Sequence, residues 1–482
     1  MTIQLRDYQE KAVADIREAM RQHRRVLLQS PTGSGKTEIF SYVTNGAARK
    51  QKRVYIIAHR AEILRQISAA ISRYNLPHGW IAPGRSPTDD VCQIGMVQTL
   101  ARRYEKLPAP DMLIVDEAHH AAKGGQYNDI ISAWPNAFVF GVTATPQRLD
   151  GRGLGDSFDK LILGPTTREL IERGFLANYT YLAPQLASFD GVKTRMGDYV
   201  SDAIAEIMDK PTITGSAIAE YKKYLDGKTA MAFCISVAHA EHVAQQFRDA
   251  GIPAASIDGK MLPHERQRIC DALAAGRIKV MTSCELVSEG FDAPSVNGCV
   301  MLRPTKSLAM VLQMVGRVLR LKPDGSNAII LDHVANYKEH GMPDTPRVWT
   351  LDGKKKKKEE FRTKKCELCF RVFEIEKDWQ KSVECDDRGE PECAVSTVVK
   401  DTGMGEGRAI DEVDGDLHEI TETPAWAGGI NIMRASGDEW RAMVERADTR
   451  EKLLQISRMR GYKKGWVAHV MKSRSAPHDR NV

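Results

Sequence analysis

The chain has 482 residues, which allows about three domains at roughly 150 residues each. Hydrophobic residues make up 42% and charged residues 27%, the balance of a globular protein with material for several cores. The net charge of +6 permits a nucleic-acid partner without requiring one, because a total does not locate the charges. No run approaches the roughly 18 apolar residues that cross a bilayer, and the N-terminal sequence lacks signal- or transit-peptide features. We therefore expect a cytoplasmic protein without a membrane partner.

The alternation of short apolar runs with amphipathic stretches predicts βαβ units and parallel sheets. The pattern occurs twice, so we expect an α/β fold with two lobes, separated by a partly helical segment from about 165 to 225. Residues 239–250 form one of the predicted helices. The predicted strands are 25–30, 54–59, 112–117 and 137–145 in the first lobe, and 230–236, 278–284, 298–303 and 328–334 in the second.

The composition changes after about residue 340. A charge-dense connector contains five consecutive lysines, Lys354 to Lys358, which are either a solvated linker or a phosphate-contacting stripe. A cysteine-rich stretch, a Gly- and acid-rich spacer and a final helical region follow. We therefore expect four domains: 1–164, 165–350, 351–400 and 401–482.

The segment SPTGSGKT (30–37) lies between a predicted strand and a helical stretch, as a phosphate-binding loop (P-loop) requires. Its glycines let the backbone wrap around a phosphate, its lysine meets the β- and γ-phosphates, and its last threonine suits Mg²⁺. The strict pattern begins with glycine, whereas this chain has Ser30. The residues that we expect to bind the nucleotide here are Thr32, Gly33, Ser34, Gly35, Lys36 and Thr37.

The segment LIVDEAHH (113–120) ends another apolar strand. In an open parallel sheet, carboxylates at this end of a strand lie beside the phosphate loop. We expect Asp116 to hold Mg²⁺ together with Thr37, and Glu117 to orient or deprotonate the attacking water. His119 and His120 have no further histidines at metal-ligand spacing, so we expect no metal site from them.

With both motifs in place, the chain resembles superfamily II helicases of the DExH type, which have two RecA-like P-loop NTPase lobes. LRDYQ (5–9) resembles the adenine-recognition element, which implies Gln9 at the edge of the adenine and Arg6 or Tyr8 near its face. AHRAEILRQ (58–66) and GMVQTL (95–100) resemble strand-gripping motifs, and TATP (143–146) resembles the element that couples hydrolysis to nucleic-acid binding. The nucleic-acid contacts implied in the first lobe are His59, Arg60, Gln98, Thr99, Thr143 and Thr145.

In the second lobe, TSCELVSEGFDAP (282–294) and QMVGRVLR (313–320) resemble the last two helicase motifs. Many relatives have Gln-Arg where this chain has Gln313-Met314, which affects a secondary contact between the lobes. The resemblance implies the catalytic residues Lys36, Glu117, Gln313, Arg317 and Arg320, the nucleotide-site residues Gly290 and Asp292 at the lobe interface, and the nucleic-acid contacts Ser236, Thr282 and Glu289.

Three further segments resemble the RadD-like branch of bacterial and phage helicases. They are RPTKS (303–307), GPTTRELIERGFLANYTY (164–181) and GYKKGWVAHVMK (461–472). The branch is associated with DNA repair and replication-fork processing. The resemblance therefore implies single-stranded or forked DNA as the substrate, and a single-strand-binding or repair protein as a candidate partner.

The nine cysteines fall into two groups. Four of them lie within about thirty residues, and the Cys-x-x-Cys pair that opens this group favours a zinc ribbon. An iron–sulfur cluster or plain surface cysteines remain alternatives, because the second pair has a wider gap. The others, in apolar segments, are expected to be buried reduced thiols. The zinc candidates are Cys366, Cys369, Cys385 and Cys393, and the buried thiols are Cys92, Cys234, Cys270, Cys284 and Cys299.

The C-terminal region mixes basic and aromatic residues, which suits either strand binding or a small helical pack with a basic exterior. We predict an ATP-dependent DNA helicase or translocase that uses ATP and Mg²⁺, with Zn²⁺ in the cysteine-rich module. The alternatives are a double-stranded DNA translocase that does not separate strands, an RNA helicase, or an adaptor that ATP switches between conformations. The basic and aromatic residues in question are Arg458, Arg460, Tyr462, Lys463, Lys464 and Trp466.

Overall fold

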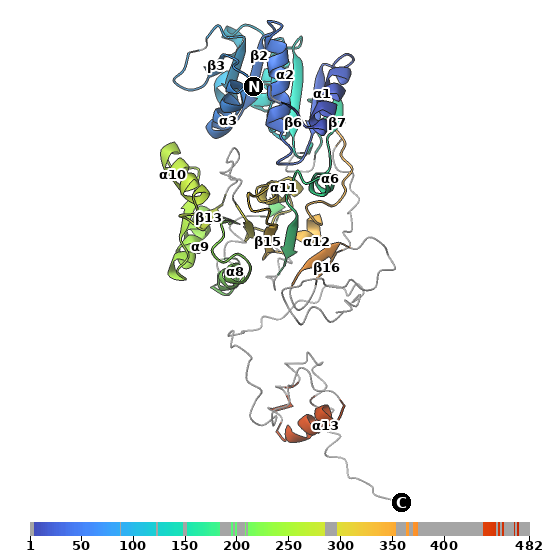
Figure 1. Ribbon diagram of the computed structural model, residues 1–482, viewed down its shortest axis with the longest axis vertical. Coiled ribbons are helices and arrows are strands. Elements are labelled where there is room, and N and C mark those ends of the chain that lie inside the picture. Colours follow the sequence, from blue (N-terminus) through green and yellow to red (C-terminus); the bar gives the residue numbers. More distant parts are fainter. Residues whose placement is uncertain are drawn as a thin grey trace, which may run out of the picture. The chain divides into compact units, whose positions relative to one another are not determined.

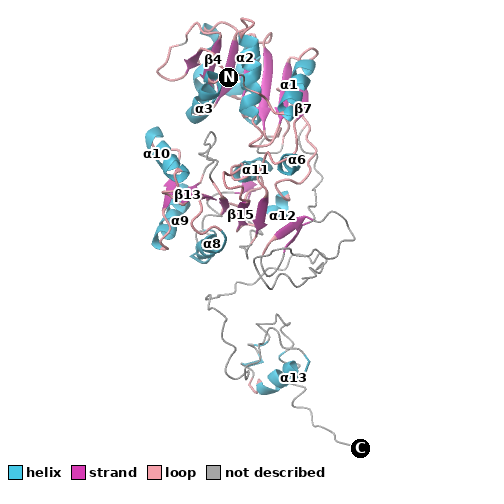
Figure 2. Cartoon of the chain, viewed as in Figure 1, coloured by secondary structure: helices cyan, strands magenta, loops and turns pink. Residues whose placement is uncertain are grey.

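The computed structural model describes residues 4–86, 88–121, 124–147, 152–183, 211–284, 296–352, 363–365, 370–374 and 437–449, together with shorter pieces. The chain divides into two compact units, Met1–Met404 and Gly405–Val482. Figures 1 and 2 show the helices and strands of both units. Within these described ranges, each helix is too short or too polar to span a bilayer.

The first lobe is built on a parallel sheet of seven strands (Figure 1). Val, Ile and Leu dominate the sequences of most of these strands, which suits a sheet with both faces covered. They are β1 (Arg25–Gln29), β2 (Val54–Ala58), β3 (His78–Ile81), β4 (Cys92–Met96), β5 (Met112–Val115), β6 (Phe138–Thr143) and β7 (Lys160–Leu163), in the spatial order β3-β4-β2-β5-β6-β1-β7.

Helices cover both faces of this sheet and enclose two hydrophobic cores. One core takes apolar residues from α1, α2 and α3, and the other takes them from α4 and α5. In α3, Ile63, Leu64, Ile67 and Ile71 recur at helical spacing and are all buried, so the amphipathic pattern decides which side faces the sheet. The helices are α1 (Asp7–Ala19), α2 (Lys36–Ala48), α3 (Ala61–Ser72), α4 (Val97–Leu100) and α5 (Gln126–Ala133).

The second lobe is built on a six-stranded parallel sheet with the order β12-β13-β11-β14-β15-β8. Its strands are β8 (Tyr179–Leu182), β11 (Ala230–Phe233), β12 (Ala254–Ile257), β13 (Val280–Ser283), β14 (Gly298–Met301) and β15 (Ala328–Asp332). Its helices are α6 (Thr167–Glu172), α8 (Pro211–Tyr224), α9 (Val237–Asp249), α10 (Pro263–Ala274), α11 (Leu308–Gly316) and α12 (Asn336–His340).

Two parallel sheets with covering helices confirm the predicted α/β fold with two RecA-like lobes. The segment 165–225 is not only a separator, because it contributes β8, which pairs with β15 at the edge of the second sheet. The five scattered cysteines are buried free thiols, as predicted. The short pair β9 (Thr194–Arg195) and β10 (Asp198–Tyr199) forms a separate hairpin, and α13 (Gly437–Arg446) lies in the second unit.

Two segments that follow α12 attach to the lobes. The backbone N–H of Gly155 donates to the carbonyl of Leu351 at 3.0 Å, and Leu351 packs against a first-lobe core, so the chain returns to the first lobe. The strands β16 (Thr363–Lys365) and β17 (Val372–Glu374) then pair antiparallel. Val372 is buried in the core of the second lobe, which fixes this hairpin to that lobe.

A substitution at Gly141 in β6 tests the packing of the first sheet. A Cβ atom at this position would lie 2.5 Å from Cζ of Phe158 and 2.9 Å from Cδ1 of Leu27. We expect Gly141→Val to lower the free energy of unfolding by about 1–3 kcal/mol, measured by urea denaturation. Gly46→Ala is the control, because Gly46 lies in α2 with open space around it. It should be neutral or stabilising by up to about 1 kcal/mol. Equal stability of Gly141→Val and the unmodified chain would contradict this packing.

Candidate active site

Three adjacent strands of the first sheet bring the candidate motifs together. The order β5-β6-β1 places the carboxyl ends of these strands side by side. The loop 30–35 follows β1, Asp116 and Glu117 follow β5, and Thr143 ends β6. The parallel topology therefore gathers segments that lie more than a hundred residues apart at one edge.

The loop 30–35 has the geometry of a phosphate cradle. Gly33 and Gly35 have φ angles of +85° and +81°, which side chains other than glycine rarely adopt. Gly35 precedes the first residue of α2, so the loop leads into the N-terminus of a helix, where anions are favoured. Lys36 Nζ donates to the carbonyl oxygens of Ser30 and Pro31, at 3.0 and 3.1 Å, across the mouth of the loop. The loop can therefore receive phosphate groups.

The N-terminal element holds the loop from outside. The hydroxyl of Tyr8 donates to the carbonyl of Ser34 at 2.9 Å, and Gln9 Nε2 donates to the same carbonyl at 3.2 Å. Gln9 Oε1 accepts from the backbone N–H of Arg6 at 3.0 Å. The predicted adenine-recognition residues Arg6 and Gln9 therefore lie beside the P-loop, with Gln9 buried and Arg6 exposed.

The two acids after β5 differ in their electrostatic surroundings. Burial, together with the neighbouring charge of Glu117, raises the pKa of Asp116 to about 7. Burial also favours a higher pKa for Glu117, but the hydrogen bond from His119, its charge and that of Lys36 outweigh this and hold the pKa at about 2. Glu117 is thus ionised at neutral pH, as a group that accepts a proton from water must be.

Asp116 and Thr37 fit a magnesium ion. The raised pKa of Asp116 indicates a buried carboxyl group that lacks sufficient counter-charge, and a divalent cation would supply it. Thr37 is the second residue of α2 and belongs to the same edge of the sheet. Carboxylate and hydroxyl oxygens are ligands that Mg²⁺ accepts beside nucleotide phosphates. Bound there, the ion would offset charge on the phosphates.

His119 connects the parts of this site, a role that the sequence analysis missed. Its Nδ1 lies 3.2 Å from Oε2 of Glu117 and 3.1 Å from Oγ1 of Thr143. Its Nε2 lies 3.5 Å from Nε2 of Gln313 in the second lobe. The side chain is 4% exposed, so these contacts are shielded from water. The signal that could have revealed it is its place directly after the acidic pair, in the same loop.

The C-terminal end of α11 brings the second lobe against the P-loop. A Cβ atom at Gly316 would lie 2.5 Å from Cβ of Thr32, and one at Gly33 would lie 3.8 Å from Cγ of Arg320. The charge of Arg317 acts on both Lys36 and Glu117. Burial lowers the pKa of Arg320. The second lobe thus places Gln313, Arg317 and Arg320 at the site formed by the first.

Lys322 supports the turn that carries these arginines, and the sequence analysis did not identify it. Its Nζ donates to the carbonyl of Val318 at 2.9 Å, and only 6% of the residue is exposed. Burial lowers the pKa of Lys322 to about 8. No sequence pattern distinguishes this lysine from the other basic residues near the motif.

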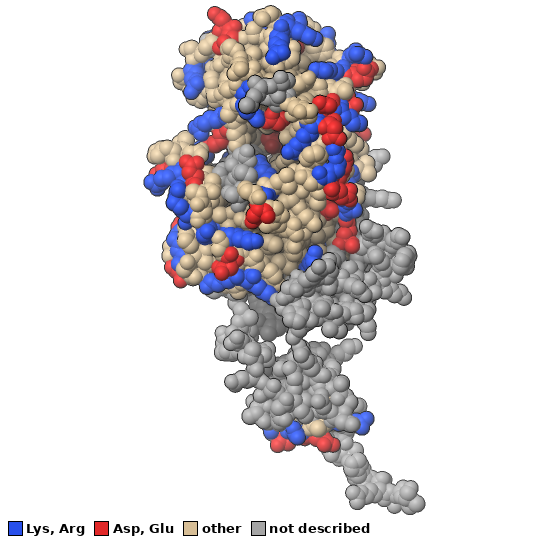
Figure 3. Space-filling view, in the orientation of Figure 1, with Lys and Arg blue, Asp and Glu red and all other residues tan. Residues whose placement is uncertain are grey.

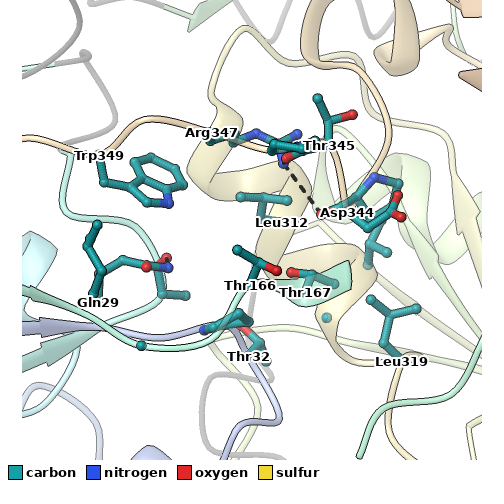
Figure 4. A pocket seen from close by; sticks show the side chains of 18 residues that line it. Gln29, Thr32, Thr166, Thr167, Leu312, Leu319, Asp344, Thr345, Arg347 and Trp349 are labelled. Carbon is teal, nitrogen blue, oxygen red and sulfur yellow. Dashed lines mark hydrogen bonds between the residues drawn. The ribbon is translucent and has the colours of Figure 1, made fainter. Parts of the chain in front are cut away.

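A cavity of about 120 Å³ lies behind the P-loop (Figure 4). Thr32 and Gln29 line it from the first lobe and Leu312 from α11. Arg347 and Trp349 line it from the segment after α12 that leads back to the first lobe. Lys36, Thr37, Asp116 and Glu117 do not line it, so it is a gap in the joint between the lobes that borders the P-loop at Thr32.

Three of the predicted nucleic-acid residues lie together in the first lobe. Gln98 Nε2 donates to the carbonyl of His59 at 3.3 Å, and Arg60 Nε donates to His59 Nε2 at 3.3 Å. The hydroxyl of Tyr127 lies 3.4 Å from His59 Nδ1 and extends the cluster, which the sequence analysis missed. In the second lobe, Ser236 accepts from the backbone N–H of His239 at 3.1 Å and caps α9.

The predicted nucleic-acid residues Thr143, Thr145 and Thr282 are buried in the structure. All three are at most 1% exposed. The hydroxyl of Thr143 donates to the carbonyl of Thr145 at 2.9 Å, and that of Thr282 donates to the carbonyl of Ala240 at 2.7 Å. Thr99 is also buried, at 8% exposure. Their side chains can influence a nucleic acid only through neighbouring residues.

Several predicted residues lie outside the described parts of the chain. Among the described residues, no group of three or more His, Cys, Asp and Glu could hold a metal ion. The zinc prediction concerns other positions and stays a prediction. The residues outside the described parts are Glu289, Gly290, Asp292, Lys354 to Lys358, Cys366, Cys369, Cys385, Cys393, Arg458, Arg460, Tyr462, Lys463, Lys464 and Trp466.

Comparison with known proteins gives the family. Residues 2–148 match the model described as "Type III restriction enzyme, res subunit", and residues 215–322 match "Helicase conserved C-terminal domain". A 51.5 kDa protein of a Lactococcus phage (isolate 7-9) is 32% identical over 74% of this chain and 80% of its own length. The candidate ATP-dependent helicase IRC3 of Saccharomyces cerevisiae is 28% identical over 68% of this chain. The chain is a superfamily II helicase.

The fold of the helicase also occurs in a solved structure of the ATP-dependent Type ISP restriction-modification enzyme LlaBIII bound to DNA. The TM-score is 0.51 at 16% identity, over 68% of this chain and 27% of that enzyme. The helicase spans 51% of the length of IRC3. The family makes the helicase an ATP-hydrolysing enzyme, and its site is consistent with ATP and Mg²⁺.

Glu117→Gln tests the role of the acidic pair. The amide keeps the shape of the side chain but cannot take a proton from water, so we expect ATP binding to persist and kcat to fall at least about 10²-fold. Calorimetry measures the binding, and phosphate release measures turnover. Glu241→Gln on the exposed face of α9 is the control and should leave both unchanged. Turnover of Glu117→Gln at the unmodified rate would rule out the assignment.

Proposed function

We propose that this protein is an ATP-dependent DNA helicase or translocase, in which nucleic acid stimulates hydrolysis and hydrolysis moves the two lobes along DNA. The lobes are 1–164 and 165–350, and the regions 351–400 and 401–482 are accessory to them. The preferred track is single-stranded or forked DNA, in repair or replication. The RadD-like resemblance supports that role and a single-strand-binding or repair protein as partner.

The observation that carries the proposal is the joint ATP site. Lys36 and Thr37 in the first lobe are expected to bind the phosphates and Mg²⁺, while Glu117 activates the water. Arg317 and Arg320 of the second lobe add positive charge where negative charge develops, an effect worth roughly 10³–10⁵ in rate. Hydrolysis removes the group that both lobes hold, so their separation changes with each turnover.

A nucleic-acid track is supported by residues at the same edge of the first sheet. His59, Arg60 and Gln98 form a connected polar cluster at least partly open to solvent, and Ser236 lies at the N-terminus of α9, which favours a phosphate. On the face drawn in Figure 3, basic and acidic side chains are interspersed over both lobes. The contacts therefore depend on specific residues rather than on net charge.

DNA is favoured over RNA by the names of the similar proteins. The model matched by residues 2–148 is that of a restriction enzyme subunit, and the LlaBIII structure is of an enzyme bound to DNA. The following experiment distinguishes this proposal from three alternatives. They are an RNA helicase, a translocase that moves on duplex DNA without separating its strands, and an adaptor that ATP switches between conformations.

The test is the steady-state ATPase rate with no nucleic acid, single-stranded DNA, duplex DNA, forked DNA or RNA. We expect single-stranded or forked DNA to stimulate the rate at least about tenfold, because the lobes close productively only on their track. Lys36→Ala provides the blank. Stronger stimulation by RNA would indicate that RNA is the track. Equal low rates with every nucleic acid, together with tight ATP-dependent DNA binding, would favour the adaptor. A strand-displacement assay separates unwinding from translocation.

We also propose that the cysteine-rich module binds one zinc ion. The strands β16 and β17 flank positions 366–369 and pair antiparallel, which are the arms that a Cys-x-x-Cys turn requires. Metal analysis of the purified chain should find about one zinc per chain, lost in Cys366→Ser and kept in Cys270→Ala, where a buried thiol in α10 is removed. Iron in place of zinc, or no metal, would contradict the proposal.

A further inference from the structure

The segment 164–181 resembles one branch of helicases, but the proposed ATP site uses none of its residues. It contains α6 and the turn that follows it. Leu170 and Leu176 are buried in the core of the second lobe, at 0% and 2% exposure. The backbone N–H of Ala177 donates to the carbonyl of Leu319 at 2.8 Å. The turn is therefore fixed to the same lobe and the same motif that carry Arg317 and Arg320.

This turn contacts the N-terminal element of the first lobe. The ring of Phe175 lies 4.6 Å from the guanidinium carbon of Arg6 and meets the ring of Tyr8 edge-on at 5.2 Å between centroids. Arg173 pairs with Asp7 at 2.6 Å and holds its own guanidinium 4.9 Å from the Phe175 ring. Two cations thus lie within cation–π distance of one aromatic ring.

The contact continues to the phosphate cradle. Tyr8 is buried in the core cluster of the second lobe, yet its hydroxyl donates to the carbonyl of Ser34 in the P-loop. Leu176 reaches the loop directly, because a Cβ atom at Gly33 would lie 2.9 Å from its Cδ2. The turn from the second lobe therefore packs against Tyr8 in the position from which it bonds the P-loop.

Arg6 is exposed although one face of its guanidinium lies over Phe175. Its Nη1 donates to the hydroxyl of Tyr8 at 3.1 Å, which holds the group in place and leaves the opposite face open. A planar guanidinium stacks on flat aromatic rings, and a purine offers a larger face than a pyrimidine. The site thus provides a platform for a purine base, next to Gln9.

We propose that Arg173 and Phe175 of the second lobe are positioning residues that fix Arg6 and Tyr8 for the base of the nucleotide. Recognition of the purine then depends on both lobes being in contact, as binding of the phosphates does at Arg317 and Arg320. The inference rests on the proposed ATP site and deepens it, because it assigns a part in base selectivity to two residues of the second lobe that lie outside the motifs of that site.

The experiment measures binding of ADP and of CDP to the full-length protein by calorimetry with Mg²⁺. We expect Arg173→Ala and Phe175→Leu to raise the Kd for ADP about three- to tenfold, the range of a cation–π contact. The Kd for CDP should change less than about twofold, because the phosphate contacts are intact. The KM for ATP should rise in parallel, while kcat stays within about twofold of the unmodified value. The exchange of charges, Asp7→Arg with Arg173→Asp, should restore most of the ADP affinity.

Arg21→Ala is the matched control, since it removes an arginine that pairs with Glu18 near the other end of α1. It should leave both dissociation constants unchanged, and thermal melting checks that each variant is folded. Equal weakening of ADP and CDP binding would overturn the proposal, as would no change in either. If the proposed ATP site itself were wrong, Lys36→Ala introduced alone would leave the ATPase rate unaffected. That outcome separates failure of the ATP site from failure of the base-recognition proposal.

Discussion

The close approach of α11 to the P-loop is the constraint on which the other features of this helicase depend. Gly316 permits it, since any side chain there would collide with Thr32, and Gly33 permits the neighbouring contact with Leu176. The phosphates of ATP carry more negative charge than one loop and one lysine can offset. The second lobe must therefore bring its arginines within reach, and only glycine backbones leave the room.

Two further contacts join the lobes, one on each side of the point where α11 approaches the P-loop. On one side, His119 Nδ1 lies 3.2 Å from Oε2 of Glu117 and 3.1 Å from Oγ1 of Thr143, and its Nε2 approaches Gln313 of the second lobe. On the other, Phe175 packs against Tyr8. The first contact links Glu117, the acid proposed to activate water, to the second lobe. The second links the base-side element to it, so both ends of a bound nucleotide would be held by residues from both lobes.

The sequence pattern predicts the strands around the phosphate loop, and the loop itself, most closely. Runs of Val, Ile and Leu predicted β1, β2, β5 and β6 to within a few residues, because a strand buried on both faces must be apolar throughout. The edge strands β3, β7, β8 and β12 were missed, as was β4 beside β3; HGWI and YTYL, for example, carry no such run. The resemblance assigns Thr143 and Thr282 to nucleic acid, and the structure buries both side chains, which no local pattern indicates.

By itself, the sequence determined the α/β class, the two lobes and the family, because alternating apolar runs and spaced glycine, lysine and acidic residues are local properties of the chain. The tertiary structure alone decided which residues meet across the lobes. His119 approaches Gln313, and Arg173 pairs with Asp7, over separations of 194 and 166 residues. Contacts of this kind depend on the order of strands in two sheets and on how the lobes pack. The periodicity and spacing of residues along the chain do not predict that arrangement.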